Sequence, residues 1–110
     1  DGRLHAFSQD GLFVWERERW RRIYHSERIT REAIRTILED RTGAIWLGLN
    51  GAVMRVAEQQ GTVLDLTRWI RKDDTVQSLL EGRDGSIWAG TRWGSLVRIS
   101  VPVFHQVNME

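Results

Sequence analysis

Five side chains in three loops of the sequence are of the types that bind a sugar or an acidic ligand. A tryptophan offers a flat apolar ring on which a sugar stacks, and arginine and aspartate form hydrogen bonds with hydroxyl or carboxylate groups. The candidate ligand-binding residues are Asn50, Arg71, Asp73, Arg92 and Trp93. They form a site only if the fold brings their loops to one side. Otherwise they are ordinary loop residues or contacts with a neighbouring part of the fold.

A second cluster, residues 16–22, places four arginines around Trp20. Such a cluster could bind an anion or a nucleic acid. The interspersed glutamates instead favour a solvated strand at the outer edge of a sheet. The formal net charge of +1 is also too small to argue for a nucleic-acid partner, so we expect none.

Catalytic and metal-binding patterns are weak in this sequence. Asp73 and Asp74 are adjacent carboxylates, but in a turn such neighbours point apart and more often cap or bend the chain. His5, His25 and His105 lack the spacing of metal ligands, and the absence of cysteine excludes disulfides and cysteine-ligated zinc. No nucleophile, phosphate-loop or zinc-protease motif occurs. We therefore expect no enzyme activity, no catalytic residues, no cofactor and no metal site.

Composition indicates a globular chain. Charged residues make up 28% and hydrophobic residues 41% of the 110 residues. The apolar runs are only a few residues long, so we expect no direct insertion into a membrane. The chain opens with Asp1-Gly2-Arg3 rather than with a signal peptide, and already inside a repeat, so we expect an excerpt from a longer protein.

An internal repeat determines the fold prediction. Residues 37–48 and 79–90 are identical at seven of twelve positions with an offset of 42, where chance gives roughly one match. Residues 51–56 match residues 94–99 at an offset of 43, so one residue is inserted near Trp93. A weaker copy opens the chain, with residues 2–4 aligned to 43–45, residues 11–14 to 51–54, and His5 in the place of a tryptophan.

Each repeat predicts four short strands, because β-branched and aromatic segments are bounded by glycine turns. We expect first strands at 34–39 and 76–81, second strands at 44–47 and 86–89, third strands at 52–56 and 95–99, and fourth strands at 20–24 and 62–66. Four antiparallel strands in about 42 residues is the size of a β-propeller blade. The sequence therefore predicts an all-β, partial propeller of about two and a half blades in one segment, with repeats at about 1–33, 34–75 and 76–110.

This topology places the candidate ligand residues on one rim. In a four-stranded meander, the turn between the second and third strands lies at the same end as the connection from the fourth strand to the next first strand. Trp46 and Trp88 occupy one repeat position, which indicates a packing role in the blade core rather than sugar stacking. We expect both to be buried at equivalent sites, and Trp88→Ala to cost about 3–5 kcal/mol.

The repeat resembles a known family. Residues 37–40, Gly43-x-Ile-Trp-x-Gly48 and Gly51-x-x-x-Arg55, with their counterparts at 79–81, 85–91 and 94–98, are similar to the two-component regulator propeller repeat. The similarity covers about residues 34–56 and 76–99. Departures are Gly82 for the usual aspartate, Leu49 for the usual threonine, and Ala52 or Ser95 for the second glycine of a pair.

The resemblance implies a cellular context. Such repeats form large propellers in the periplasmic part of bacterial membrane receptors that carry histidine kinase, response-regulator or diguanylate cyclase modules. The propeller is thought to sense a ligand, often a glycan, and to relay dimer geometry across the membrane. The resemblance therefore implies a segment of a bacterial extracytoplasmic sensor in signal transduction, with a glycan or small acidic ligand as its partner.

Two other functions remain open from the sequence. One is a structural or assembly fragment without a ligand of its own, which closes a ring by homo-oligomerisation or with further blades of a parent chain. The other is an enzyme on a propeller scaffold, such as a lyase or glycosidase. Propellers need four to eight blades, and an end blade exposes an apolar face, so we expect no stable closed monomer.

Overall fold

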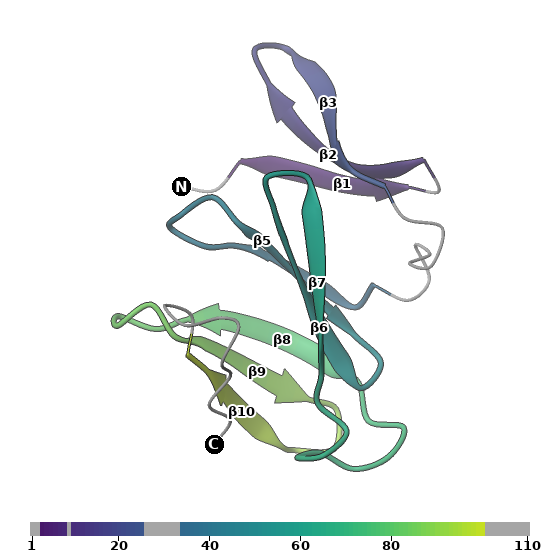
Figure 1. The fold of residues 1–110 in the computed structure, drawn as a ribbon, viewed down its shortest axis with the longest axis vertical. Helices are drawn as coiled ribbons and strands as arrows, with labels where there is room; N and C mark the ends of the chain where they lie inside the picture. The colour runs from purple at the N-terminus through teal and green to yellow at the C-terminus, as the bar shows by residue number, and fades with distance from the viewer. Residues whose placement is uncertain (1–2, 9, 26–33, 101–110) are drawn as a thin grey trace.

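The computed structural model describes residues 3–8, 10–25 and 34–100, which form three antiparallel sheets stacked one on another (Figure 1). The first sheet contains β1 (Leu4–Ser8), β2 (Gly11–Glu16) and β3 (Arg19–Tyr24). The second contains β4 (Thr36–Glu39), β5 (Ile45–Leu49), β6 (Ala52–Ala57) and β7 (Gln60–Asp65). The third contains β8 (Val76–Glu81), β9 (Ile87–Thr91) and β10 (Leu96–Ile99). The predicted all-β architecture is confirmed.

Every sheet is a meander in which neighbours in sequence are neighbours in space. The turns between first and second strands contain Gly43 and Gly85 with φ of 92° and 87°, a conformation that glycine adopts without a Cβ clash. The sheet β4–β7 has all four predicted strands, whereas each of the other two sheets has three strands among the described residues. Within the described residues, no helix is long and apolar enough to cross a membrane.

Strand pairing gives the repeats a common register. In the second sheet Trp46 pairs with Arg55, and in the third sheet Trp88 pairs with Arg98. In the first sheet His5 pairs with Val14, so His5 takes the tryptophan position, as the sequence alignment predicts.

The register also corrects one part of that alignment. Gly11 pairs with Ser8 as Ala52 pairs with Leu49. Gly11 therefore corresponds to Ala52 and not to Gly51, so the alignment of residues 11–14 with 51–54 is wrong by one position. A shift of one residue exchanges the two faces of a strand. With the corrected register, Leu12 and Val14 point into the protein, where both are fully buried.

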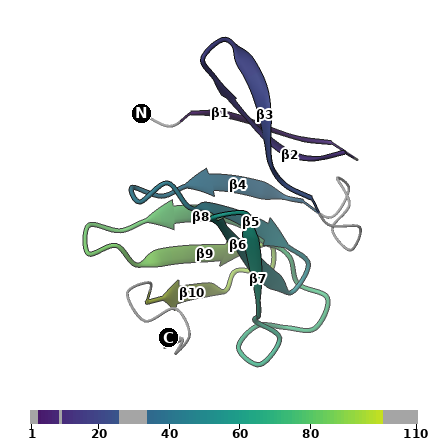
Figure 2. The same cartoon turned by 45° about the horizontal axis from the view of Figure 1, so that its top comes forward.

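Two apolar layers hold the three sheets together. Between the first and second sheets, Leu12 and Phe7 pack against apolar residues of β5 and β6. Between the second and third sheets, Trp46 and Val53 pack against apolar residues of β8, β9 and β10, and β4 lies beside β8 (Figure 2). The middle sheet is therefore covered on both faces, and every residue of β5 is buried.

The two repeated tryptophans differ in burial, which corrects a prediction. Trp46 is fully buried between the second and third sheets. Trp88 has the equivalent register but is only half-buried, because its side of the third sheet faces away from the stack. The expected cost of 3–5 kcal/mol for Trp88→Ala is therefore too high for the three-sheet chain, since that range applies to a fully enclosed aromatic side chain.

A buried carboxylate accounts for a second difference between these tryptophans. Asp40 accepts hydrogen bonds from Trp46 Nε1 at 2.9 Å, from the Ala44 N–H at 3.0 Å and from the Thr42 Oγ1 hydroxyl at 2.6 Å. Gly82 occupies the same position in the third sheet. An ideal Cβ on Gly82 would lie 3.2 Å from Trp88 Nε1, so this indole lacks the carboxylate that Trp46 has.

Gly82→Asp should therefore stabilise the protein. Gly82 lies outside the left-handed region, so its backbone accepts an aspartate. The ideal Cβ lies 3.2 Å from Trp88 Nε1 and 3.3 Å from Asp84 Oδ1, so the new carboxylate reaches the indole N–H once the Asp84 side chain gives way slightly. We expect the free energy of unfolding to rise by about 0.5–1 kcal/mol, measured by urea denaturation. Gly82→Ala is the control, because it restricts the unfolded chain without adding an acceptor. Equal effects of the two variants would contradict a new hydrogen bond.

Candidate functional site

Three loops meet at one end of the second and third sheets. Asn50, in the β5–β6 turn, forms a bridge with Thr75, in the β7–β8 connection. The Gly51 N–H donates to the Asp74 carbonyl at 2.8 Å, and the Arg92 N–H donates to the Thr75 carbonyl at 2.9 Å. The structure thus brings the loops of all the candidate ligand residues to one rim. This rim consists of Asn50, Arg71, Asp73, Arg92 and Trp93.

Trp93 is the centre of the rim. Its side chain is 54% exposed. The Arg71 guanidinium carbon lies 4.7 Å from the centroid of the Trp93 ring, and that of Arg92 lies 6.0 Å from it. A cation over an aromatic face is attracted by the ring quadrupole. The three side chains therefore form one exposed aromatic and cationic cluster with guanidinium donors at the surface.

The Asp74 carboxylate holds the backbone that carries this cluster. It is fully buried, and its Oδ1 accepts the backbone N–H groups of Thr75 at 2.8 Å and Trp93 at 3.0 Å. Burial would raise the pKa of Asp74, but hydrogen bonds from the Thr91 hydroxyl and these two N–H groups hold it below its usual value. Asp74 thereby joins the β7–β8 connection to the β9–β10 turn. The sequence pattern did not indicate this role of Asp74.

Asp73 differs from Asp74 in its exposure and in its backbone conformation. It is exposed, and its φ of 66° is left-handed, a conformation that aspartate tolerates in turns. One carboxylate of the adjacent pair is therefore buried and the other faces solvent. This agrees with the interpretation of Asp73 and Asp74 as turn residues rather than as a pair of catalytic carboxylates.

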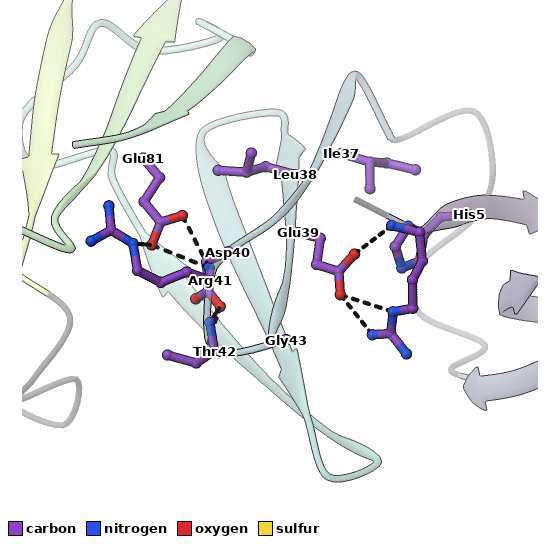
Figure 3. A pocket seen from close by; sticks show the side chains of 10 residues that line it. His5, Ile37, Leu38, Glu39, Asp40, Arg41, Thr42, Gly43 and Glu81 are labelled. Atoms are coloured by element: carbon purple, nitrogen blue, oxygen red, sulfur yellow. Dashed lines mark hydrogen bonds and ion pairs between the residues drawn. The ribbon is translucent and has the colours of Figure 1, made fainter. Parts of the chain in front are cut away.

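The opposite end of the sheets carries a polar depression of about 1000 Å³ (Figure 3). Two arginine–glutamate clasps cross it from one sheet to the next. Arg3 binds Glu39 through its backbone N–H at 2.9 Å and its Nη2 at 2.8 Å. Arg41 binds Glu81 through its backbone N–H at 3.0 Å and its Nε at 3.0 Å. Figure 3 shows Arg41 turned toward Glu81 and away from Glu39.

The charges of this depression are already engaged within the protein. Burial would raise the pKa of Glu39, but hydrogen bonds from Arg3 hold it below its usual value. Burial lowers the pKa of His5, which also lines the depression and is uncharged at neutral pH. Glu39 and Glu81 bind arginines of a neighbouring sheet, and Asp40 is bonded within its own β4–β5 hairpin. Since all three carboxylates have partners from the chain, the rim is the stronger candidate for a ligand.

The two clasps were not predicted from the sequence, although a signal was present for the Arg41–Glu81 clasp. Glu39 recurs as Glu81 and Arg41 recurs as Arg83 at the repeat offset of 42. A recurring pair of opposite charges indicates a contact between repeats, just as a recurring tryptophan indicates packing. Only the stacking of the sheets in the structure shows that an arginine of one repeat binds the glutamate of the next.

The arginine-rich segment 16–22 and His5 lie away from the rim. In the arginine-rich cluster, Glu16 binds Arg21 at 2.7 Å and Arg3 at 3.3 Å, and Trp20 is exposed. This is consistent with a solvated edge strand. Among the described residues, no group of three or more histidine, aspartate or glutamate side chains could hold a metal ion. His105 lies outside the described residues.

Comparison with known families supports the repeat assignment. Residues 71–93 match the family described as Two component regulator propeller, which confirms the resemblance for this repeat. A comparison with curated proteins found no match. The matched stretch begins in the β7–β8 connection, includes β8 and β9, and ends in the β9–β10 turn. Its two ends are Arg71 and Trp93, the pair that stacks at the rim.

Proposed function

We propose that this chain is part of an extracytoplasmic, ligand-sensing propeller of a bacterial signalling receptor, and that its rim binds a glycan or a small acidic ligand. The match of residues 71–93 to a two-component regulator propeller repeat supports the signalling context. The observation that carries the binding site is the exposed Trp93 ring with Arg71 and Arg92 over it. This function is binding, without a chemical step.

The rim supports this proposal through the chemistry of its side chains. The exposed part of the Trp93 ring offers an apolar face to a sugar. Arg71 and Arg92 can each donate paired hydrogen bonds to a carboxylate, which favours an acidic sugar over a neutral one. Asn50 and Asp73 are exposed at the same end and suit hydroxyl groups.

The rim is also held in place before a ligand arrives. Asp74 fixes the Trp93 backbone, and the Arg92 N–H is bound to the Thr75 carbonyl. A site whose loops are already ordered loses less conformational entropy on binding. A sensor of this kind can therefore bind a small ligand with few contacts.

The test is the affinity for a uronic-acid oligosaccharide, measured by titration calorimetry. Arg92→Ala combined with Trp93→Ala removes one charged donor pair and the stacking ring. We expect affinity to fall by about 100-fold, which corresponds to about 2.7 kcal/mol. Arg83→Ala is the control, because it removes an exposed arginine at the opposite end of the sheets. An unchanged affinity of the double variant would refute the assignment of the site.

A further inference from the structure

The connection between β7 and β8 presents a second aromatic and cationic segment next to the rim. Its exposed residues are 67–69 and 71–73, whereas Leu66, Ile70 and Asp74 are buried at every fourth position. Leu66 and Ile70 pack into the apolar core between the second and third sheets. The two exposed triplets therefore face solvent at the ends of the strands, where the connection crosses between two sheets that the structure describes (Figure 1).

A single glycine holds both ends of this connection. The Leu66 N–H donates to the Gly51 carbonyl, and the Gly51 N–H donates to the Asp74 carbonyl, each at 2.8 Å. Gly51 belongs to the β5–β6 turn and has a φ of 69°, a conformation that glycine adopts without strain. The connection is thus closed at its base, so its backbone is already ordered when a ligand binds.

Trp69 is the aromatic side chain of this connection. It is 43% exposed, and the Arg68 guanidinium carbon lies 5.9 Å from the centroid of its ring. The Trp69 N–H donates to the Leu66 carbonyl at 2.8 Å, which places Trp69 in a tight turn. Trp69 with Arg68 thus has the same composition as Trp93 with Arg71, an exposed ring with a guanidinium over it.

Arg71 links these two pairs. It follows Trp69 by two residues, and two residues of chain span at most about 7 Å. Its guanidinium carbon lies 4.7 Å from the centroid of the Trp93 ring. The arginine that stacks on Trp93 therefore belongs to the same short loop as Trp69, and a chain-like ligand can reach both rings.

The surface around both rings carries an excess of positive charge. Its exposed carboxylates are Asp65 and Asp73, and Asp65 already accepts the Thr67 N–H at 2.8 Å and the Thr67 hydroxyl at 2.7 Å. In the part of the chain that the structure describes, no ion pair involves the cations of this surface. These exposed cations are Arg68, Arg71, Lys72 and Arg92. They are free for a ligand, unlike the arginines of the clasps at the opposite end.

We propose that Trp69 and Arg68 form a second subsite, which adjoins the rim and binds a further acidic unit of the same oligosaccharide. This inference rests on the proposed function, because it takes the rim at Trp93 as the first subsite. The Trp69 ring offers an apolar face to a sugar, and Arg68 donates paired hydrogen bonds to its carboxylate. An oligosaccharide with successive acidic units engages both subsites at once, whereas a single acidic sugar engages one.

The affinity for a tetrasaccharide of galacturonic acid tests the second subsite. In the unaltered chain, we expect the tetrasaccharide to shift both the Trp69 and the Trp93 indole signals in a ¹⁵N-correlated NMR spectrum, and to bind more tightly than galacturonic acid itself. Arg68→Ala combined with Trp69→Ala should lower the affinity for the tetrasaccharide by about 10-fold, followed through the Trp93 signal. Both side chains are exposed, so folding should persist, as circular dichroism can verify.

The control is Arg19→Ala combined with Trp20→Ala, which removes an exposed arginine and an equally exposed tryptophan, 44% accessible, from β3 of the first sheet. It should bind the tetrasaccharide like the unaltered chain, and an equal loss in this control would overturn the second subsite. If the change at Arg68 and Trp69 leaves the affinity intact while Arg92→Ala with Trp93→Ala lowers it, the second subsite is wrong and the rim stands. If neither change lowers the affinity, the proposed function itself fails.

Discussion

Replacing Trp46 with alanine is expected to lower the free energy of unfolding by about 3–5 kcal/mol, the range for a buried aromatic side chain. Trp46 is fully buried between the second and third sheets, its Nε1 donates to Asp40, and the Arg55 guanidinium lies 5.9 Å from its ring centroid. The truncation would leave a cavity between two sheets and an acceptor without its donor. Equilibrium denaturation in urea measures this loss.

Trp88→Ala is the matched control, because Trp88 has the same register in a sheet that has no neighbour on that side among the described residues. We expect a loss of about 1–2 kcal/mol, in proportion to a half-buried side chain. If Trp88→Ala costs as much as Trp46→Ala, the stacking order of the sheets is wrong.

Asp40→Ala should have the second largest effect. The change leaves the Trp46 indole N–H and the Ala44 N–H without an acceptor in a buried setting, and it removes the acceptor of the Thr42 hydroxyl. Unpaired buried donors cost about 1–3 kcal/mol each, so we expect a total loss of about 2–4 kcal/mol. A loss of unfolding free energy no larger than that caused by substituting an exposed residue would show that Asp40 does not anchor the indole.

The pH dependence of stability offers a separate test of Asp40. Burial would raise its pKa, but hydrogen bonds from Thr42, Trp46 and Ala44 hold it below the usual value. Because the pKa in the folded state is lowered, the stabilisation is complete above the unfolded-state pKa of about 4 and is lost as the pH falls through the folded-state value. The free energy of unfolding of the Asp40→Asn variant should therefore differ less from that of the unaltered chain in acid than at neutral pH.

A second carboxylate must be separated from this effect. The Ser86 N–H and the Arg98 guanidinium lower the pKa of Asp84 to about 2, so Asp84 also contributes to acid destabilisation. Its contribution is common to both chains in the comparison with Asp40→Asn and cancels. A stability difference that stays constant throughout the acid range would contradict ionisation of Asp40 as the source of the stabilisation.

The sequence was sufficient to predict the strands, because the repeat supplied two aligned copies with glycines at the turns. Gly43 and Gly85 do adopt positive φ, and the predicted strand positions correspond to those found. The register of the first copy was not predictable in the same way. Gly11 and Gly51 each open a strand in the alignment, and only the pairing of Gly11 with Ser8 shows that the first copy is shifted by one residue.

Burial was less predictable than register. Trp46 and Trp88 share residue type, repeat position and an arginine as strand partner, yet within the described residues a further sheet packs over Trp46 and not over Trp88. The difference depends on what packs against the outer face of each sheet, which no residue within one repeat determines. The clasps of Arg3 and Arg41 were not predictable for the same reason, since each joins two repeats rather than two positions within one repeat.

The rim could be placed from the sequence because topology alone determines which loops share an end of a meander. The stacking of Arg71 on Trp93 and the anchoring of Trp93 by Asp74 required coordinates. Trp69, with the Arg68 guanidinium 5.9 Å from its ring, lies in the same connection as Arg71 and was not singled out. It carried no repeat signal that would separate it from other loop residues.

The proposed binding of a glycan or small acidic ligand at the rim can be followed through the tryptophan indole signals in a ¹⁵N-correlated NMR spectrum. The six tryptophans give separate reporters across the chain. On titration with a uronic-acid oligosaccharide, we expect the Trp93 indole signal to shift with saturation, and the buried Trp46 signal at the core between the sheets to stay in place. A spectrum in which the Trp93 signal remains unmoved at saturating oligosaccharide would contradict the assignment of the rim as the binding site.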